Sequence, residues 1–405
     1  MKILHTSDWH LGHMLYGHDR TEEQQAMLNQ MVEIVKEEQP DVFILAGDVY
    51  HTSDPRPAVQ ALFNKTIANL VRQCPEMTIV VTAGNHDSST KHEIFKTPWE
   101  ALNVHVIGKF DKDNLESLIV EVPNKGYVVA MPFVFERFLP EDIYERLAEM
   151  VSQRNKTGLP VVLSAHAAIK DVDFTGHDDV TERRVGGVDI VDVSKISHGF
   201  DYVALGHIHK LQFVHTGHHN VRYCGTPLDV SFDEIYDKPH SVTIVEINHH
   251  GETLTDDNYK YIPIKNIRPL VTLPDPKDTT KFGKWENVWA QYNAYPETAK
   301  VYIRLNISDP EAMPSNAYEM CKKQAEGKEY EFCCINSPKK QATSTTENGI
   351  PQLSVEEFQK LDPWDVVKMF AADTQDASFN ETEMEPLFEE ALNELNYQKR
   401  EEKQL

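Results

Sequence analysis

The sequence DVFILAGDVYH, residues 41–51, combines the two features that decide the fold. Its first half is a short apolar run that ends at a glycine, a pattern typical of a strand buried on both faces. Its second half places Asp48 and His51 directly after that strand. The stretch therefore predicts a central strand of an α/β sheet with polar chemistry at its carboxyl end.

Strands of the same kind lie on both sides of this stretch, MKILHTS (1–7) before it and TIVVTAG (78–84) after it. Residues 24–39 and 58–73, which separate the three strands, repeat apolar side chains at helical spacing. Strands that alternate with helices predict an α/β layer with a largely parallel sheet. Two further strands of this type are PVVLSAH (160–166) and DYVALGH (201–207).

The pattern changes after residue 210, where strands follow one another without long helices. They are LQFVHT (211–216), VRYCGTPL (221–228), SVTIVEI (241–247) and YKYIPI (259–264). We expect these strands to form a second, more antiparallel sheet, so that two sheets lie inside and the helices lie outside.

The remaining chain predicts three smaller parts. Residues 266–336 have the pattern of a small α+β unit, with three strands and a helix over 316–326. Residues 337–350 are a polar linker rich in Ser, Thr, Lys and Asn. Residues 351–405 predict two short helices with an apolar stripe that includes Met384 and Phe388. Two such helices cannot bury a core of their own, so they either dock on a partner or fold back on their own chain.

Composition limits the class of protein. The 405 residues are 40% hydrophobic and 26% charged, and we find no apolar run of the ~18 residues that a membrane span needs. The first residues run straight into a strand and Asp8 without the pattern of a secretory signal, so we expect a cytoplasmic protein that contacts no membrane. The five cysteines show no CxxC spacing, which argues against a structural zinc site and a disulfide framework.

The formal charge of −24 argues against a basic binding face that covers the whole chain, because Lys and Arg dominate affinity for nucleic acid. The charge is unevenly placed, since residues 341–405 hold 15 acidic against 5 basic side chains. A local basic groove thus remains compatible with the sequence. Candidates for it are Arg20, Lys91, Arg137, Arg183 and Arg184, although ordinary solvent exposure explains most of them.

Side chains that bind metals follow five of the predicted strands. Because the carboxyl ends of parallel strands meet at one edge of a sheet, we expect these side chains to converge on one rim. Seven of them are potential ligands: Asp8, His10, Asp48, Asn85, His166, His207 and His209. Taken singly, each motif has a structural explanation as a turn, a helix cap or surface histidines. Their occurrence in order, each at a strand end, favours the metal site.

The donor chemistry narrows the metal and the reaction. Four imidazoles, two carboxylates and one amide oxygen, with no thiolate, suit Mn, Fe or Zn. Two divalent ions sharing one bridging group are the usual solution for phosphate cleavage. Asp48 is our choice for that bridge, because a carboxylate can bind two cations and Asp48 is central in the strand order. His86 could instead give a proton to the leaving oxygen or stabilise charge on the phosphoryl group.

The motifs DWH, GDVYH, GNHD, SAH and GHIH together resemble the calcineurin-like metallophosphoesterases. The longer strings HTSDWHLG, AGDVYH, GNHDS, LGHIH and GTPLDVSFDE resemble the nuclease subunits of bacterial SbcCD complexes, relatives of the eukaryotic and archaeal double-strand-break-repair nuclease. The resemblance is strong over residues 1–265 and weak over 266–336, and residues 350–398 match by pattern only. It implies a four-layer αββα sandwich in 1–265, a capping domain in 266–336 and C-terminal helices that bind an ATPase in 351–405.

The resemblance also implies a role for each site residue. One Mn²⁺ would be held by Asp8, His10, Asp48 and His209, and the other by Asp48, Asn85, His166 and His207. His86 matches the catalytic histidine that assists the phosphate transition state, and His51 matches a second histidine implicated in nuclease activity. Many family members carry Asp where this chain has His51, so the resemblance leaves the role of His51 open.

Partners follow from the resemblance as well. The family implies a homodimer bound to two copies of a coiled-coil ATPase, a heterotetramer that processes DNA double-strand breaks in recombination and replication. Its activities are an exonuclease on duplex ends and an endonuclease on hairpins and single strands. The chain has no GxxxxGK[ST] phosphate loop, so any ATP dependence must come from the partner. A DNA surface shared with the ATPase would ease the conflict with the acidic charge.

Two alternatives remain open from the sequence. The first is a metallophosphoesterase for nucleotides, cyclic nucleotides or phosphoproteins, although GDVYHTSDPR (47–56) lacks the DRG expected of a Ser/Thr phosphatase of this family. The second is a scaffold with a dead site, which would usually have lost ligands. All seven ligand positions are filled here.

Overall fold

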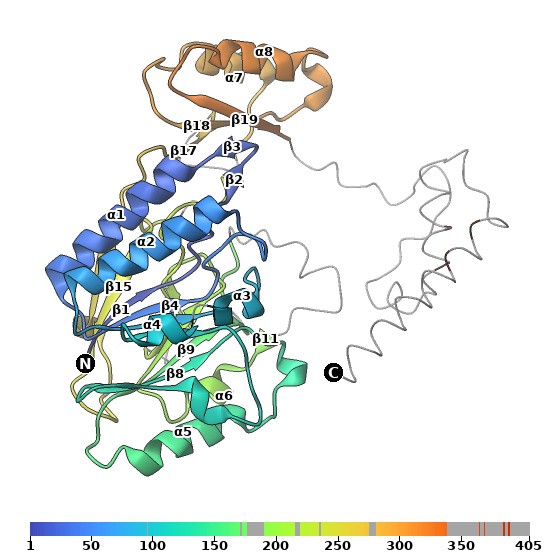
Figure 1. The fold of residues 1–405 in the computed structure, drawn as a ribbon. Coiled ribbons are helices and arrows are strands. Elements are labelled where there is room, and N and C mark those ends of the chain that lie inside the picture. Colours follow the sequence, from blue (N-terminus) through green and yellow to red (C-terminus); the bar gives the residue numbers. More distant parts are fainter. Residues whose placement is uncertain are drawn as a thin grey trace. The chain divides into compact units, whose positions relative to one another are not determined.

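The computed structural model describes residues 1–94, 96–170, 172–175, 190–214, 219–234, 236–274 and 281–337, together with Trp364, Lys368, Met384 and Phe388. The chain divides into two compact units, Met1–Pro338 and Lys339–Leu405. The first unit holds every sheet described below (Figure 1). Among the described residues, no helix is long and apolar enough to cross a membrane.

The first sheet has six strands in the order β16-β15-β1-β4-β5-β6. Four of them run parallel: β1 (Lys2–Thr6), β4 (Val42–Ala46), β5 (Thr78–Thr82) and β6 (Val104–Ile107). The antiparallel pair β15 (Ser241–Glu246) and β16 (Tyr259–Pro263) completes it along β1. The helices α1 (Thr21–Glu38) and α2 (Pro57–Gln73) cover one face (Figure 1). They pack Met31 and Ile67 into one core cluster with Phe43.

The second sheet also has six strands, in the order β13-β14-β12-β9-β8-β7. Its strands are β7 (Ile119–Val122), β8 (Gly126–Met131), β9 (Val161–His166), β12 (Tyr202–Gly206), β13 (Gln212–Phe213) and β14 (Val221–Tyr223). Its central strands β8, β9, β12 and β14 are parallel. On its outer side lie α5 (Ile143–Arg154) and α6 (Val193–Ser197), and Leu147 of α5 belongs to the core cluster that joins the two sheets. Because β-strand side chains alternate, Ile44 faces this inter-sheet core while Phe43 faces the helices.

The expected four-layer αββα sandwich is thus confirmed, but the expected division of strands between its sheets was partly wrong. The strands of residues 241–247 and 259–264 pair with β1 in the first sheet, where they cover an edge that would otherwise be exposed. The strands ending at His166 and Gly206 belong to the second sheet. The hairpin β7–β8 was not expected. A strand's own sequence predicts its burial, whereas its sheet depends on distant partners.

Several other elements of the first unit, in its larger and smaller parts, are short. They are β2 (Met14–Leu15), β3 (His18–Asp19), α3 (Ser89–Ile94), α4 (Lys96–Glu100), η1 (Leu115–Leu118), η2 (Glu136–Phe138), β10 (Ala168–Ile169), β11 (Ile190–Val191), η3 (Asp256–Asn258) and η4 (Pro310–Ala312). The most consequential is η2, a single 3₁₀ turn between β8 and α5.

Residues 266–336 form a smaller α+β arrangement within the first unit. It contains β17 (Leu270–Leu273), β18 (Tyr302–Asn306), β19 (Glu331–Asn336), α7 (Trp285–Asn293) and α8 (Ala317–Ala325). Its three parallel strands and two helices enclose a core of their own around Val288, Ile303 and Tyr330. The predicted strands and the 316–326 helix are present, and α7 is an addition. The domain boundary after residue 265 stays a prediction.

Buried polar contacts tie this smaller part to the larger one. The Tyr302 hydroxyl donates to Glu23 at 2.9 Å, and Arg304 pairs with Asp233 at 2.7 Å. Arg20 lies in the same interface, where it is 1% exposed and donates to the Asp229 carbonyl. The suggestion that Arg20 lines a surface groove was therefore wrong, because this side chain serves the interface.

The second unit is described at four residues, all helical. The Trp364 ring lies 5.2 Å from the Phe388 ring, so each of the two predicted C-terminal helices contributes one side chain to an apolar contact. The rest of the predicted helices and most of the 337–350 linker lie outside the described residues.

Candidate metal centre

The loops after five strands bring nine predicted site residues together. Asp8 and His10 follow β1, Asp48 and His51 follow β4, and Asn85 and His86 follow β5. From the facing sheet, His166 ends β9, and His207 and His209 follow β12. The rim is therefore built by two sheets rather than by one, because the parallel strands of both sheets end at the same side of the sandwich.

One group of possible metal ligands consists of Asp8, His10 and His209, whose ligand atoms all lie within 4.8 Å of one another. The Nε2 atoms of His10 and His209 are 3.1 Å apart. His209 Nδ1 lies 2.7 Å from Glu234 Oε1. A carboxylate can only accept, so Nδ1 carries the proton and the neutral ring keeps its lone pair on Nε2. This histidine is thus oriented as a metal ligand.

A second group forms around His166. Its Nδ1 donates to the Ala46 carbonyl at 2.9 Å, which again leaves Nε2 as the ligand atom. That Nε2 lies 2.9 Å from Asn85 Oδ1 and 3.3 Å from Asp48 Oδ2. The same Asn85 oxygen is 3.1 Å from His207 Nδ1. Amide oxygen, carboxylate and imidazole therefore meet at one point.

Asp48 connects the two groups. Its Oδ2 lies 3.3 Å from His166 Nε2 and 3.7 Å from His10 Nε2, so this one atom faces a ligand of each group. Its Oδ1 accepts from the His86 backbone N–H at 2.9 Å, which fixes the orientation of the carboxylate. Two of the three-residue groups that could hold a metal, Asp8–His10–His209 and Asp8–Asp48–His166, have Asp8 in common, and the second also contains Asp48.

The backbone is unusual at four of these positions. Asp8, His10, Asp48 and His207 have φ of 53°, 43°, 51° and 99°, a region that L-residues rarely adopt. Such strain costs on the order of 1–3 kcal/mol per residue and typically persists at functional sites. Gly84 shows how closely the loops approach, since a Cβ there would lie 2.1 Å from Asp48 Oδ1.

The electrostatics of the site call for cations. Asp8 and Asp48 are 0% and 2% exposed, and no lysine or arginine in the described ranges forms an ion pair with either. Burial raises the pKa of Asp8. Burial also opposes ionisation of Asp48, but the neighbouring His166 outweighs it and holds the pKa of Asp48 well below its usual range. Buried carboxylates need a compensating positive charge, and divalent metal ions would supply it.

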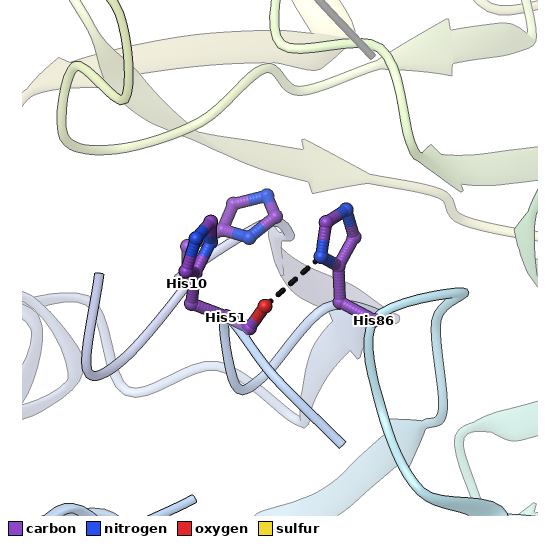
Figure 2. Close-up of side chains that lie close together, drawn as sticks. All are labelled: His10, His51 and His86. Atoms are coloured by element: carbon purple, nitrogen blue, oxygen red, sulfur yellow. Dashed lines mark hydrogen bonds between the residues drawn. The ribbon is translucent and has the colours of Figure 1, made fainter. Parts of the chain in front are cut away.

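His86 and His51 lie beside these groups (Figure 2). His86 Nδ1 donates to the His51 backbone carbonyl at 3.0 Å, which fixes the orientation of the His86 ring. The His86 ring centroid is 4.9 Å from that of His10, and the His51 ring stacks on the His86 ring at 5.6 Å. The three imidazoles His10, His51 and His86 also form a group within 4.8 Å. Both predicted catalytic histidines are thus placed at the centre.

Comparisons with known proteins agree with this geometry. Residues 1–211 match the family described as calcineurin-like phosphoesterase. The SbcD chain of the nuclease SbcCD from Bacillus subtilis (strain 168) is 30% identical over 329 residues, 76% of this chain and 80% of the relative. The chain of the same name from Escherichia coli (strain K12) is 30% identical over 68% of this chain and 70% of the relative. This chain belongs to the calcineurin-like phosphoesterases, in the SbcD family.

As a calcineurin-like phosphoesterase, the protein is a metal-dependent phosphodiester hydrolase. The nitrogen and oxygen donors described above suit divalent ions of the Mn, Fe and Zn type. The identity of the metal and the role of each single residue stay predictions.

Three residues that hold the ligands were missed by sequence reasoning. Glu234 orients His209, and Thr226 donates to the Asp8 carbonyl at 2.9 Å. Asp87 accepts from the backbone N–H groups of Val49, Tyr50 and Gly84 and so joins the β4 and β5 loops. All three lie in the strings GNHDS and GTPLDVSFDE, but nothing in a linear pattern shows which ligand they support.

The suggested basic groove of this phosphoesterase is only partly described. Lys91 pairs with Asp54, and the Arg137 guanidinium lies on the rings of Phe135 and Phe138. Arg183 and Arg184 lie outside the described residues.

Proposed function

We propose that this protein is a Mn²⁺-dependent nuclease that hydrolyses DNA phosphodiester bonds at duplex ends, hairpins and single strands. The observation that carries the proposal is the pair of ligand groups meeting at Asp48, which is the arrangement that a two-metal phosphodiesterase needs. The relatives are named as a nuclease, which supports a nucleic acid as the substrate.

In this proposal, Asp8, His10, Asp48 and His209 hold one ion, and Asp48, Asn85, His166 and His207 hold the other. Bound metal ions would activate water and stabilise negative charge on the phosphate. His86 acts from outside the ligand set. Because its Nδ1 donates to the His51 carbonyl, the proton that His86 delivers to the leaving oxygen is the Nε2 proton of its imidazolium form, which leaves the ring neutral with the proton on Nδ1. His51 positions His86 through that carbonyl.

A nuclease assay tests the proposal. Purified protein is incubated with and without Mn²⁺ on linear duplex, hairpin and single-stranded DNA and on the small diester bis(p-nitrophenyl) phosphate. We expect Mn²⁺-dependent cleavage of DNA and a loss of about 10²–10⁴-fold in rate for His86→Ala with metal content unchanged. Hydrolysis of the small diester without cleavage of any of the three DNA substrates would support the alternative phosphoesterase. DNA cleavage unchanged in His86→Ala would overturn the assignment of His86.

We further propose that residues 351–405 bind an SbcC-type coiled-coil ATPase, in a heterotetramer built on a homodimer of this chain. The relatives are named as one component of a nuclease complex, which supports a partner, and the contact between Trp364 and Phe388 shows that apolar side chains of this segment meet. Deleting residues 351–405 should abolish co-purification of the ATPase and leave cleavage of the small diester intact. Unchanged co-purification would contradict docking.

A further inference from the structure

An aromatic ladder leads outward from the candidate metal centre. We give this name to Phe133, Phe135 and Phe138, which lie between β8 and α5. The Phe133 ring lies 6.2 Å from the His166 ring and 6.4 Å from the His207 ring. Phe135 meets Phe133 edge to face at 5.1 Å, and Phe138 meets Phe135 at 6.3 Å. The ladder thus begins at two predicted metal ligands.

The outer part of the ladder is exposed. Phe135 is 42% exposed and Phe138 is 66% exposed, although solvent exposure of large aromatic rings is unfavourable. The exposed Arg137 lies on both rings, with its guanidinium carbon 4.3 Å from the Phe135 centroid and 5.0 Å from the Phe138 centroid. Aromatic faces beside an arginine are the surface on which nucleobases stack.

The ladder is held in place rather than being a loose loop. Phe133 donates its backbone N–H to the Ala83 carbonyl at 2.8 Å, next to the loop that carries Asn85. The η2 turn is closed by a hydrogen bond from Phe138 N–H to the Phe135 carbonyl at 2.9 Å. Glu136 of this turn pairs with Lys195 of α6 at 2.5 Å. A fixed platform loses little entropy when a ligand binds to it.

We propose that the ladder stacks an unpaired nucleobase that flanks the scissile phosphate, so that the site selects single-stranded or frayed DNA. The proposal rests on the proposed function and adds the substrate class to it. Continuity with the phosphate-cleaving centre favours a nucleic-acid ligand over a protein at this face. Stacking also supplies affinity that does not depend on a high density of basic residues, which suits a chain of net charge −24.

The test compares two single-stranded oligonucleotides of one length, one with natural bases and one with abasic sites around the cleavage position, with Mn²⁺ present. We expect kcat/KM to be about tenfold higher for the oligonucleotide with natural bases. A tenfold difference corresponds to ~1.4 kcal/mol, which is the contribution of one stacked base. In Phe135→Leu/Phe138→Leu this ratio should fall to about one, while hydrolysis of bis(p-nitrophenyl) phosphate stays unchanged. Phe138→Trp should keep the ratio.

The matched control is Tyr318→Leu, which removes an exposed aromatic ring from residues 266–336. The Tyr318 side chain is 46% exposed, and Lys322 Nζ lies 5.0 Å from its ring centroid. This control should keep the ratio of the wild type. If the double variant loses activity on the small diester, the base preference is measured in the single variant Phe138→Leu instead. The Phe138 ring contacts Phe135 and not the predicted metal ligands, so this change should leave the metal centre intact. The proposed base stacking would be overturned by a ratio of kcat/KM for natural over abasic DNA near one in the wild type. It would also be overturned if the wild-type ratio persisted in the variants.

Two results separate this inference from other failures. Absence of hydrolysis of every substrate, including the small diester, would overturn the metal centre and the ladder's role together. Normal hydrolysis of the small diester with no base preference would overturn the ladder alone. Light scattering compares the mass of the double variant with that of the wild type. A lower mass, with the base preference kept, would identify the ladder as a contact between protein chains and overturn the proposal.

Discussion

Glu234 is the residue whose role the geometry defines most sharply beyond the ligands themselves. Its carboxylate accepts from His209 Nδ1 at 2.7 Å and also from the Val230 backbone N–H at 3.1 Å. It thereby fixes the tautomer that presents Nε2 to a metal ion. We predict that Glu234→Gln weakens Mn²⁺ affinity about 10–100-fold, and that excess Mn²⁺ restores most of the rate.

Titration of activity with Mn²⁺ on the small diester checks this prediction. Glu246→Gln, a change at an exposed end of β15, is the control and should not alter the midpoint. A loss of rate in Glu234→Gln that no concentration of Mn²⁺ repairs would mean that Glu234 takes part in the chemistry directly.

At the same scale, motifs in the sequence indicated the seven predicted ligands and His86, and the family resemblance added His51 as a second histidine. Short motifs at strand ends reveal them because a ligand must follow its strand closely. Supporting residues escape prediction for a physical reason. Glu234 reaches His209 from 25 positions away, and only the folded backbone sets that contact.

At the scale of elements, His240 joins the start of β15 to the loop that follows β14. It pairs with the half-buried Asp229 at 2.7 Å, and Asn266 and Arg20 contact the same aspartate. Burial opposes the imidazolium, but Asp229 outweighs burial and raises the pKa of His240 to about 9. The unfolded-state pKa of a histidine is about 6.5.

A histidine whose pKa rises on folding stabilises the protein fully below its unfolded pKa and loses that contribution as pH rises through the folded pKa. We therefore predict that the free energy of unfolding falls between about pH 6.5 and 9, by up to ~3 kcal/mol from this pair. Urea unfolding at several pH values should show that His240→Gln lacks this dependence. The exposed His249→Gln should retain it, and an identical pH profile in both variants would refute the assignment.

Elements were easier to predict than sheets. β1, β4, β5, β9 and β12 lie at the predicted positions because each is a continuous apolar run. The partners of β15 and the pairing of β7 with β8 were not evident, since strand pairing depends on residues far apart in the chain.

At the scale of the whole molecule, the interface around Glu23 holds residues 266–336 against the larger part of the first unit. Glu23 is 2% exposed and contacts the Tyr302 hydroxyl at 2.9 Å and Arg268 Nε at 3.2 Å. Replacing Glu23 by Ala removes the carboxylate that both partners share, which costs about 1–3 kcal/mol.

We predict that Glu23→Ala increases hydrogen exchange in β18 while hydrolysis of the small diester stays unchanged. Glu33→Ala removes an exposed carboxylate from the same helix. Glu33 pairs with Lys36 at the surface, so this change should leave exchange unchanged. A loss of activity in Glu23→Ala would show that this interface shapes the metal centre itself.

The proposal that two metal ions share Asp48 is open to anomalous diffraction at the Mn absorption edge from a crystal grown with Mn²⁺. We predict two anomalous peaks ~3.5–4 Å apart. Both should lie against Asp48, one beside His10 and His209, the other beside Asn85, His166 and His207. A single peak, or two peaks of which one does not contact Asp48, would contradict the claim.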